Sequence, residues 1–118
     1  MALARGAAGE RAERLAAEYL AAQGVTIIER NFRRRCGELD LIARDGETLV
    51  FVEVRLRTRH DFGGAAASIT AAKRARIAAA AGLYLARLGH TPPCRFDAVL
   101  LDALDPDRVE WLKDMMGV

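Results

Sequence analysis

The sequence predicts a single α/β domain with a mixed central sheet flanked by helices. The 118 residues are enough for one domain of ordinary size and no more. Apolar residues follow helical spacing in two segments and strand spacing in the segments between and after them. A long helical segment also separates two apolar strand segments, and this arrangement favours parallel pairing of those strands when they are neighbours.

The first part of the chain predicts a helix followed by three strands. Apolar residues recur at helical spacing over residues 6–23, and Gly24 ends the helix. A strand at 25–32, a turn at 33–37 and two further strands at 38–44 and 48–56 follow it. Asp45-Gly46 separates the last two strands and is among the strongest short signals for a hairpin, so these strands are expected to pair antiparallel.

The second part of the chain predicts a long helix followed by strands. The helix begins at about Ser68 or Thr70 and ends near Leu88, where Gly89 and then two prolines follow. Residues 95–102 predict another strand, and residues 109–113 predict a short final one. The expected order is therefore α-β-β-β-α-β, with one more strand at the end of the chain.

The composition excludes several classes of protein. Hydrophobic residues make up 52% and charged residues 29%, which is typical of a globular chain and not of a disordered one. The longest nearly apolar run, 77–86, is too short to cross a bilayer, and charged residues interrupt the region where a signal peptide needs an apolar core. Cys36 and Cys94 lack the spacing of metal ligands or of a disulfide framework. These features predict a soluble cytoplasmic protein with no membrane partner.

Arginine dominates the basic residues and clusters in two short stretches. Of the 18 basic residues 16 are Arg, and only Lys73 and Lys113 are Lys. The candidates for contacts with nucleic-acid phosphates are Arg33, Arg34, Arg35, Arg57 and Arg59. Such clusters also occur on ordinary solvated surfaces, and the net charge of +2 does not decide between the two interpretations.

The predicted hairpin at 38–56 brings acidic residues together. A two-residue turn at Asp45-Gly46 predicts the opposed pairs Ile42–Leu49, Asp40–Phe51 and Glu38–Glu53. One face of the hairpin is then entirely apolar and faces the core, with Leu39, Leu41, Ala43, Val50, Val52, Val54 and Leu56. The other face becomes polar at one end, where it carries Glu38, Asp40, Glu53 and Arg55.

Three neighbouring carboxylates repel one another, so a positive charge is expected among them. A Mg²⁺ ion would supply this charge, because magnesium prefers oxygen ligands and is often held by one or two carboxylates. Arg55 and nearby arginines are the other candidates. Lys73 lies near the start of the second predicted helix, on the stripe that faces the sheet. Its side chain either points toward the carboxylates or reaches out to solvent.

A series of short motifs runs through the chain: Gly9-Glu10, Tyr19-Leu20, Arg30-Asn31-Phe32-Arg33, Gly37-Glu38-Leu39-Asp40-Leu41-Ile42, Phe51-Val52-Glu53-Val54-Arg55 with Arg57, Phe62-Gly63, Lys73 and Arg95-Phe96-Asp97. This combination resembles the YraN family of small, largely uncharacterised bacterial proteins. The resemblance implies a restriction-endonuclease-like fold related to Holliday-junction resolvases. It covers about residues 6–102, which makes this segment the core of a domain spanning 1–118 and leaves 103–118 as a C-terminal strand or tail.

The resemblance also implies roles for individual residues. The wider nuclease superfamily has an Asp on one strand and Glu-x-Lys on the next, and Asp40 and Glu53 match these two acids. They would be ligands of Mg²⁺, with Mn²⁺ as a substitute, and Val54 would offer its backbone carbonyl to the same ion. Glu10 resembles an additional acid of resolvase-like members, and Lys73 resembles the helical lysine of the family.

Arg55 departs from this signature, which has lysine at that position. Arginine keeps the positive charge and can stabilise phosphate, but it is essentially never deprotonated and cannot act as a general base. We expect a magnesium-dependent endonuclease acting on phosphodiester bonds of DNA, selective for branched or single-stranded sites because no sequence-reading helix is evident. The alternative is a non-catalytic nucleic-acid-binding or protein-interaction module on the same fold.

The C-terminal residues bear on assembly. Trp111, Leu112, Met115 and Met116 form an apolar cluster in the sequence. This cluster either contributes to a homodimer interface or simply covers the end of the sheet. A symmetric dimer would present the two equivalent sites that resolution of a branched junction requires.

Overall fold

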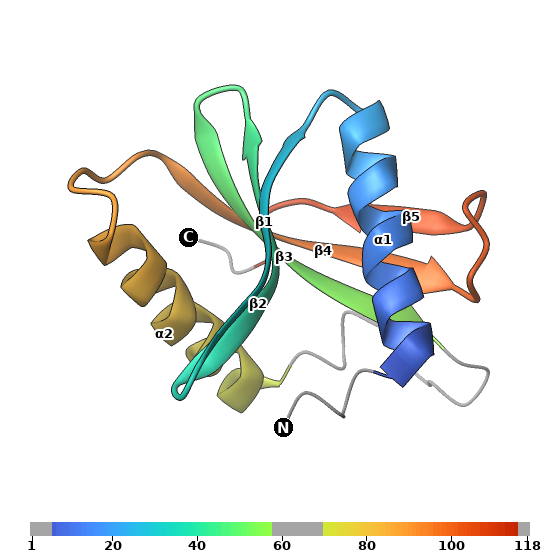
Figure 1. Cartoon of the computed structure of the whole chain (residues 1–118), viewed down its shortest axis with the longest axis horizontal. Helices are drawn as coiled ribbons and strands as arrows, with labels where there is room; N and C mark the ends of the chain where they lie inside the picture. Colours follow the sequence, from blue (N-terminus) through green and yellow to red (C-terminus); the bar gives the residue numbers. More distant parts are fainter. Residues whose placement is uncertain (1–5, 58–69, 116–118) are drawn as a thin grey trace.

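The computed structural model describes residues 6–57 and 70–115, which form a five-stranded mixed sheet with one helix on each face (Figure 1). In chain order the elements are α1 (Gly6–Ala22), β1 (Thr26–Arg34), β2 (Gly37–Asp45), β3 (Thr48–Arg57), α2 (Ala71–Ala86), β4 (Cys94–Asp102) and β5 (Val109–Leu112). This order confirms the predicted α/β class and the short final strand. The predicted turn at 33–37 is too long, because β1 continues through Arg34 and only Arg35 and Cys36 remain in the turn.

The ends of α2 are set by local chemistry. The Thr70 hydroxyl accepts a hydrogen bond from the backbone N–H of Lys73 at 3.1 Å and so caps the first turn of the helix. The helix ends at Ala86, two residues before the predicted end, and Arg87 is its C-terminal cap. Gly89 follows with a φ of 74°, a conformation that glycine adopts without steric cost.

The strands lie in the order β1-β2-β3-β4-β5, so β3 is at the centre of the sheet. All neighbouring strands pair antiparallel except β3 and β4, which are parallel. The parallel pair confirms the prediction drawn from the intervening helix, because α2 carries the chain back to the starting edge of β3. In this pair Glu53 lies opposite Ala98.

Each face of the sheet has its own apolar core. On the α1 side the helix contributes mostly small side chains, which allow it to pack closely on the strands: Ala12, Ala16, Ala17 and Leu20 lie against Leu41, Ala43, Val50, Val52, Val54, Val99 and Leu101. On the α2 side Ile77, Ala80, Ala81 and Tyr84 pack against Phe32, Leu39, Ile42, Leu49 and Phe51. The two helices thus bury opposite faces of the hairpin formed by β2 and β3 (Figure 1).

The register predicted for this hairpin is wrong by two residues. Asp45 pairs with Thr48 and Ile42 pairs with Phe51, so the turn residues are Gly46 and Glu47, not Asp45 and Gly46. Gly46 has a φ of 63° at the first position of the turn, which is where a II′ hairpin turn requires glycine. A shift of two residues keeps each side chain of the paired segment on its predicted face.

The predicted face of Leu39 is also wrong. Leu39 pairs with Phe32 of β1 and packs with it on the α2 side, whereas Leu41 packs on the α1 side. The reason lies in the backbone, because β2 is paired with β3 only as far as Leu41 and then follows β1 alone. Next to this point Asn31 has a φ of 55°, in the left-handed region that asparagine tolerates better than most residues. The regular alternation of side chains is therefore interrupted here.

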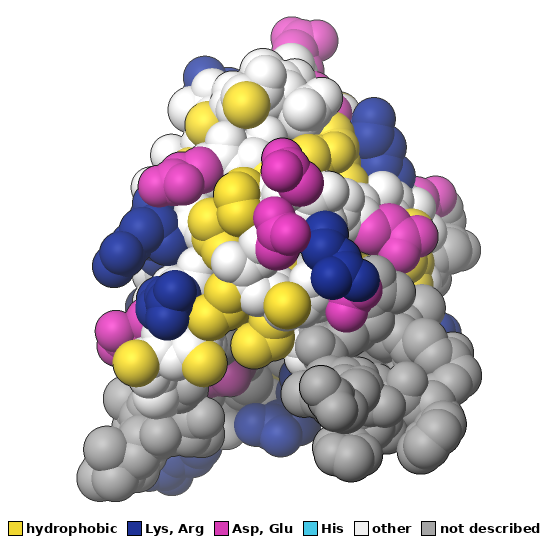
Figure 2. All heavy atoms as spheres, turned by 90° about the vertical axis from the view of Figure 1, so that its right-hand side faces the viewer, with side chains coloured by type: hydrophobic (Ala, Val, Ile, Leu, Met, Phe, Trp, Pro, Cys, Tyr) yellow, Lys and Arg dark blue, Asp and Glu magenta, His cyan; other side chains and the backbone are white. Residues whose placement is uncertain are grey.

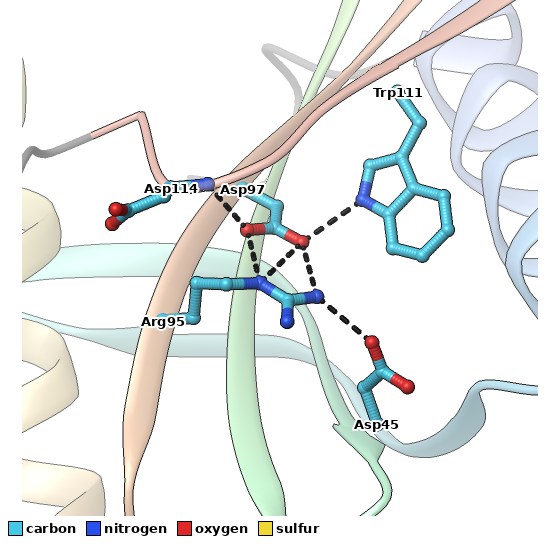
Figure 3. A network of polar contacts seen from close by, with 5 residues as sticks. All are labelled: Asp45, Arg95, Asp97, Trp111 and Asp114. Carbon is cyan, nitrogen blue, oxygen red and sulfur yellow. Dashed lines mark hydrogen bonds and ion pairs between the residues drawn. The ribbon is translucent and has the colours of Figure 1, made fainter.

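The C-terminal segment is held on the sheet by a buried carboxylate, Asp97 of β4 (Figure 3). Its two oxygens accept hydrogen bonds from Nε and Nη2 of Arg95, from Nε1 of Trp111 and from the backbone N–H of Asp114, all at 2.9–3.2 Å. The hydrogen bond to Asp97 raises the pKa of Arg95, whose Nη2 also reaches Asp45 in the hairpin at 3.1 Å. One side chain thus joins β4, β5 and the residues after β5.

This network shows how the apolar C-terminal residues pack. Trp111 lies against the α1-side core and its ring meets that of Tyr19 edge to face, with centroids 6.5 Å apart. Leu112 and Met115 pack on Ala98 and Leu100. The described part of the cluster therefore covers the end of the sheet, while Met116 lies outside the described residues. The homodimer stays a prediction, which light scattering would test against a 12.9 kDa monomer.

Neither α1 nor α2, the helices of the described ranges, is long and apolar enough to cross a membrane. On the side of the molecule that carries α1, basic and acidic side chains alternate with apolar ones (Figure 2). Among the described residues on this face, the basic side chains do not form one continuous stripe of the kind that binds a nucleic-acid backbone.

Candidate active site

Asp40 lies where β2 and β3 separate and is almost completely buried, with 1% of its surface exposed. Its Oδ2 accepts a hydrogen bond from the backbone N–H of Val54 at 2.8 Å. The carboxylate therefore takes the place of a main-chain acceptor at the point where the ladder between the two strands ends. This bond holds the side chain of Asp40 against the strand that carries the second predicted acid.

Glu53 is also buried, and its side chain is 8% exposed. Its Oε2 lies 2.5 Å from Nζ of Lys73 in α2 and 3.9 Å from Nη1 of Arg55 in β3. Both cations are about one third exposed, so each is in contact with solvent as well as with the buried acid. Of the two roles considered for Lys73, the structure shows the one in which its side chain points toward the carboxylates.

These residues surround one open hollow of about 280 Å³, which we call the site hollow. Its lining consists of Gly9, Glu38, Asp40, Glu53, Val54, Arg55 and Lys73. Asp40, Glu53, Arg55 and Lys73, which the sequence analysis named as site residues, all line this hollow, and their roles stay a prediction. Three acids and two cations from β2, β3 and α2 therefore line this hollow.

A second hollow, also of about 280 Å³, adjoins the first. It is lined by Glu38, Thr70, Ala72, Lys73, Arg76 and Ile77, so Glu38 and Lys73 belong to both hollows. Arg76 was not among the predicted site residues. Its position three residues after Lys73 in a predicted helix was the available signal, because such residues share a face.

The position of α2 over this region depends on Gly37 at the start of β2. A Cβ atom at Gly37 would lie 2.2 Å from the backbone oxygen of Arg76. The strand and the helix backbone thus approach more closely than any side chain permits. This contact fixes the distance between the strand that carries Asp40 and the helix that carries Lys73.

Two acids of α1, Glu10 and Glu13, differ in their burial. Glu10 is exposed and is not among the residues that line the site hollow, so its role stays a prediction. Glu13 is 3% exposed and lies one turn after Gly9, which does line the hollow. Sequence reasoning missed Glu13, although its place in the small apolar stripe between Ala12 and Ala16 was a signal for burial.

The clustered arginines differ in their surroundings. Arg33 pairs with Glu38 at 3.6 Å, and the guanidinium of Arg34 stacks 4.0 Å above the ring centroid of Phe32. Arg35 is exposed in the turn between β1 and β2. Arg57 is the last residue of β3, and Arg59 lies outside the described residues.

Carboxylate oxygens line the site hollow, and they are of the kind that a hard divalent cation prefers as ligands. In the two described ranges no three Asp, Glu, His or Cys side chains form a group that could hold a metal, so the three-carboxylate cluster expected at Glu38, Asp40 and Glu53 is not formed. Magnesium, however, is commonly held by one or two carboxylates and keeps several waters. The two buried acids beside an open hollow meet this requirement.

Comparison with known proteins supports the relationship suggested by the motifs. The model of the uncharacterised protein family UPF0102 matches residues 12–101. A UPF0102 protein of Methylobacillus flagellatus is 53% identical over 106 residues, which are 90% of this chain and 93% of that protein. A UPF0102 protein of Dechloromonas aromatica is 56% identical over 108 residues, which are 91% of this chain and 86% of that protein. The YraN-like resemblance is thereby confirmed at the level of the family, and the chain belongs to the UPF0102 family.

Proposed function

We propose that this protein is a metal-dependent endonuclease that hydrolyses phosphodiester bonds of DNA on a restriction-endonuclease-like fold. The observation that carries the proposal is the arrangement of Asp40, Glu53, Lys73 and Arg55 around one open hollow. Hydrolysis of a phosphodiester needs acids that hold a cation and positive groups that balance the phosphate charge. The site hollow has both kinds of group, and they come from the strands and the helix to which the YraN-like motifs assign them.

In the proposed reaction Asp40, Glu53 and the backbone carbonyl of Val54 hold Mg²⁺ or Mn²⁺. When bound, such an ion supplies an activated water and a counter-charge for the phosphate. The hydrogen bond from the Val54 N–H fixes one oxygen of Asp40 and so orients the carboxylate. Arg55 and Lys73 stabilise the negative charge that develops on the phosphate, and Arg55 does so without exchanging a proton.

The neighbouring residues support binding of the substrate. Glu13 is the better candidate than Glu10 for the additional acid, because it is buried one turn from a residue that lines the site hollow. The candidates for contacts with DNA phosphates are Arg35, which is exposed, and Arg76, which lines the second hollow. Contacts of this kind carry little sequence information, so the proposed substrate is a branched or single-stranded DNA structure.

The test is a cleavage assay on a panel of end-labelled DNA: single strands, duplexes, flaps and four-way junctions, each with Mg²⁺ or Mn²⁺. We expect cleavage of at least one structure by the natural chain and none by Asp40→Asn or Glu53→Gln. These variants keep the size of the side chain and remove its charge. They therefore distinguish cleavage at the site hollow from cleavage by a contaminating nuclease.

Two results would contradict the proposal. Cleavage that persists unchanged in both variants would come from another protein. DNA binding without cleavage of any structure, in either metal, would instead support a non-catalytic binding module, in which Arg55 marks the loss of the signature lysine. Fluorescence anisotropy of the same labelled DNA measures binding independently of cleavage.

A further inference from the structure

The contact between Lys73 and Glu53 is the closest ion pair of the site. The ammonium nitrogen of Lys73 lies 2.5 Å from Oε2 of Glu53, whereas the nearest guanidinium nitrogen of Arg55 is 3.9 Å away. The Glu53 side chain is 8% exposed, so its negative charge is largely removed from water and depends on a nearby cation. Lys73 is the group that supplies this charge in the free protein.

A divalent ion bound by Glu53 would need the same carboxylate. Two cations held within a few ångströms of each other in a partly buried site repel strongly, because the effective dielectric constant there is far below that of water. The ammonium of Lys73 therefore has to move away when such an ion binds. Its side chain is 35% exposed and also lines the second hollow, which gives the ammonium a place to go.

We propose that Lys73 is a built-in cation that competes with a divalent ion for Glu53, and that it links ion binding in the site hollow to phosphate binding in the second hollow. This inference rests on the proposed function, because it requires the divalent ion of that function. The free protein binds the ion weakly, since each binding event displaces an ion pair. A DNA phosphate bound in the second hollow, beside Arg76, forms an ion pair with the displaced ammonium of Lys73. Binding of the divalent ion and binding of DNA therefore strengthen each other.

The test compares Mn²⁺ binding by isothermal titration calorimetry, without DNA, in the natural chain and in Lys73→Met. Methionine keeps the length and helix preference of lysine and removes its charge. We expect the Kd for Mn²⁺ to fall at least tenfold in Lys73→Met. Lys113→Met is the matched control, because Lys113 is the other lysine of the chain, lies over the Trp111 ring at 4.4 Å and lines neither hollow. Its Kd should equal that of the natural chain.

Further variants separate the two proposals. Glu53→Gln should no longer bind Mn²⁺. If Glu53→Gln binds Mn²⁺ as tightly as the natural chain does, or if none of the proteins binds it, the metal site of the proposed function is disproved. This inference is then disproved with it. If the natural chain binds through Glu53 but Lys73→Met binds no more tightly, only the competition is disproved. Thermal unfolding shows whether Lys73→Met folds, and Lys73→Gln replaces it in the same comparison if it does not.

Discussion

The backbone N–H of Val54 donates a hydrogen bond to Oδ2 of Asp40 at 2.8 Å, so that one candidate acid replaces the strand pairing that β2 and β3 lose at this point. The bond gives Asp40 a structural function in addition to its proposed chemical one. Substitutions at this position therefore have to be chosen so that the two functions are tested separately.

Asp40→Asn and Asp40→Ala should differ in stability. Asparagine retains an oxygen that accepts from Val54, whereas alanine leaves this buried N–H without its partner. We expect Asp40→Ala to lower the free energy of unfolding by about 1–3 kcal/mol and Asp40→Asn to lower it by much less. Urea unfolding measures both. Equal losses in the two variants would show that the hydrogen bond does not stabilise the fold.

Gly37→Ala should destabilise the protein strongly. The new methyl group would lie 2.2 Å from the backbone oxygen of Arg76, so β2 and α2 must move apart, at a cost of at least about 2 kcal/mol. Gly82→Ala is the matched control in α2, because a Cβ there meets nothing within 4 Å. Alanine is the better helix former, so the control should gain about 0.5–1 kcal/mol. Thermal denaturation measures the stability of both variants. A Gly37→Ala protein as stable as the natural chain would show that the close approach of β2 and α2 does not constrain the fold.

Asp97→Ala should be the most harmful of the carboxylate substitutions. It leaves Arg95 without its main partner in a partly buried position and removes the acceptor of Trp111 Nε1, so a loss of about 3–5 kcal/mol is expected. The control is Asp102→Ala, which breaks an exposed pair with Arg108 and should cost less than about 1 kcal/mol. Chemical unfolding followed by Trp111 fluorescence compares the two, and similar losses would contradict the assigned importance of the network.

Arg55→Lys should preserve or increase DNA cleavage. Lysine restores the signature of the nuclease superfamily and keeps the positive charge beside Glu53. Arg55→Met, which removes the charge, should lower the initial rate at least tenfold under the same conditions. If the lysine variant were as slow as the methionine variant, the guanidinium itself would be required, and the departure from the signature would be an adaptation of this chain.

Much of the fold follows from local signals in the sequence. Helical and strand periodicities, Gly24 after α1 and Thr70 before α2 mark elements that the structure contains, and the intervening helix predicts the parallel pair. The pairing register does not follow from such signals, because Asp45-Gly46 and Gly46-Glu47 are both plausible two-residue turns. The pairing of Asp45 with Thr48 in the folded hairpin distinguishes them.

The candidate site was predicted in its acids and less well in their surroundings. The motif names Asp40 and Glu53 on neighbouring strands, and both line the site hollow. Burial of Glu13 and of Asp97 was missed, since a charged residue in a sequence is ordinarily expected at the surface. The pairing of Glu53 with Lys73 joins β3 to α2, and tertiary packing alone determines which of two nearby cations comes closer.

The central position of β3 has a consequence for how the chain folds. β3 meets β2 across a two-residue turn, but it meets β4 only after the whole of α2 has been made. Because distant contacts cost more entropy to form, we expect the hairpin to form early and β4 to dock late, an order that pulsed hydrogen exchange during refolding would show or refute. Until β4 docks, β3 has an unpaired apolar edge that can bind another chain. The strand that carries Glu53 is therefore also the main aggregation hazard of the half-folded protein, and docking of β4 removes that hazard.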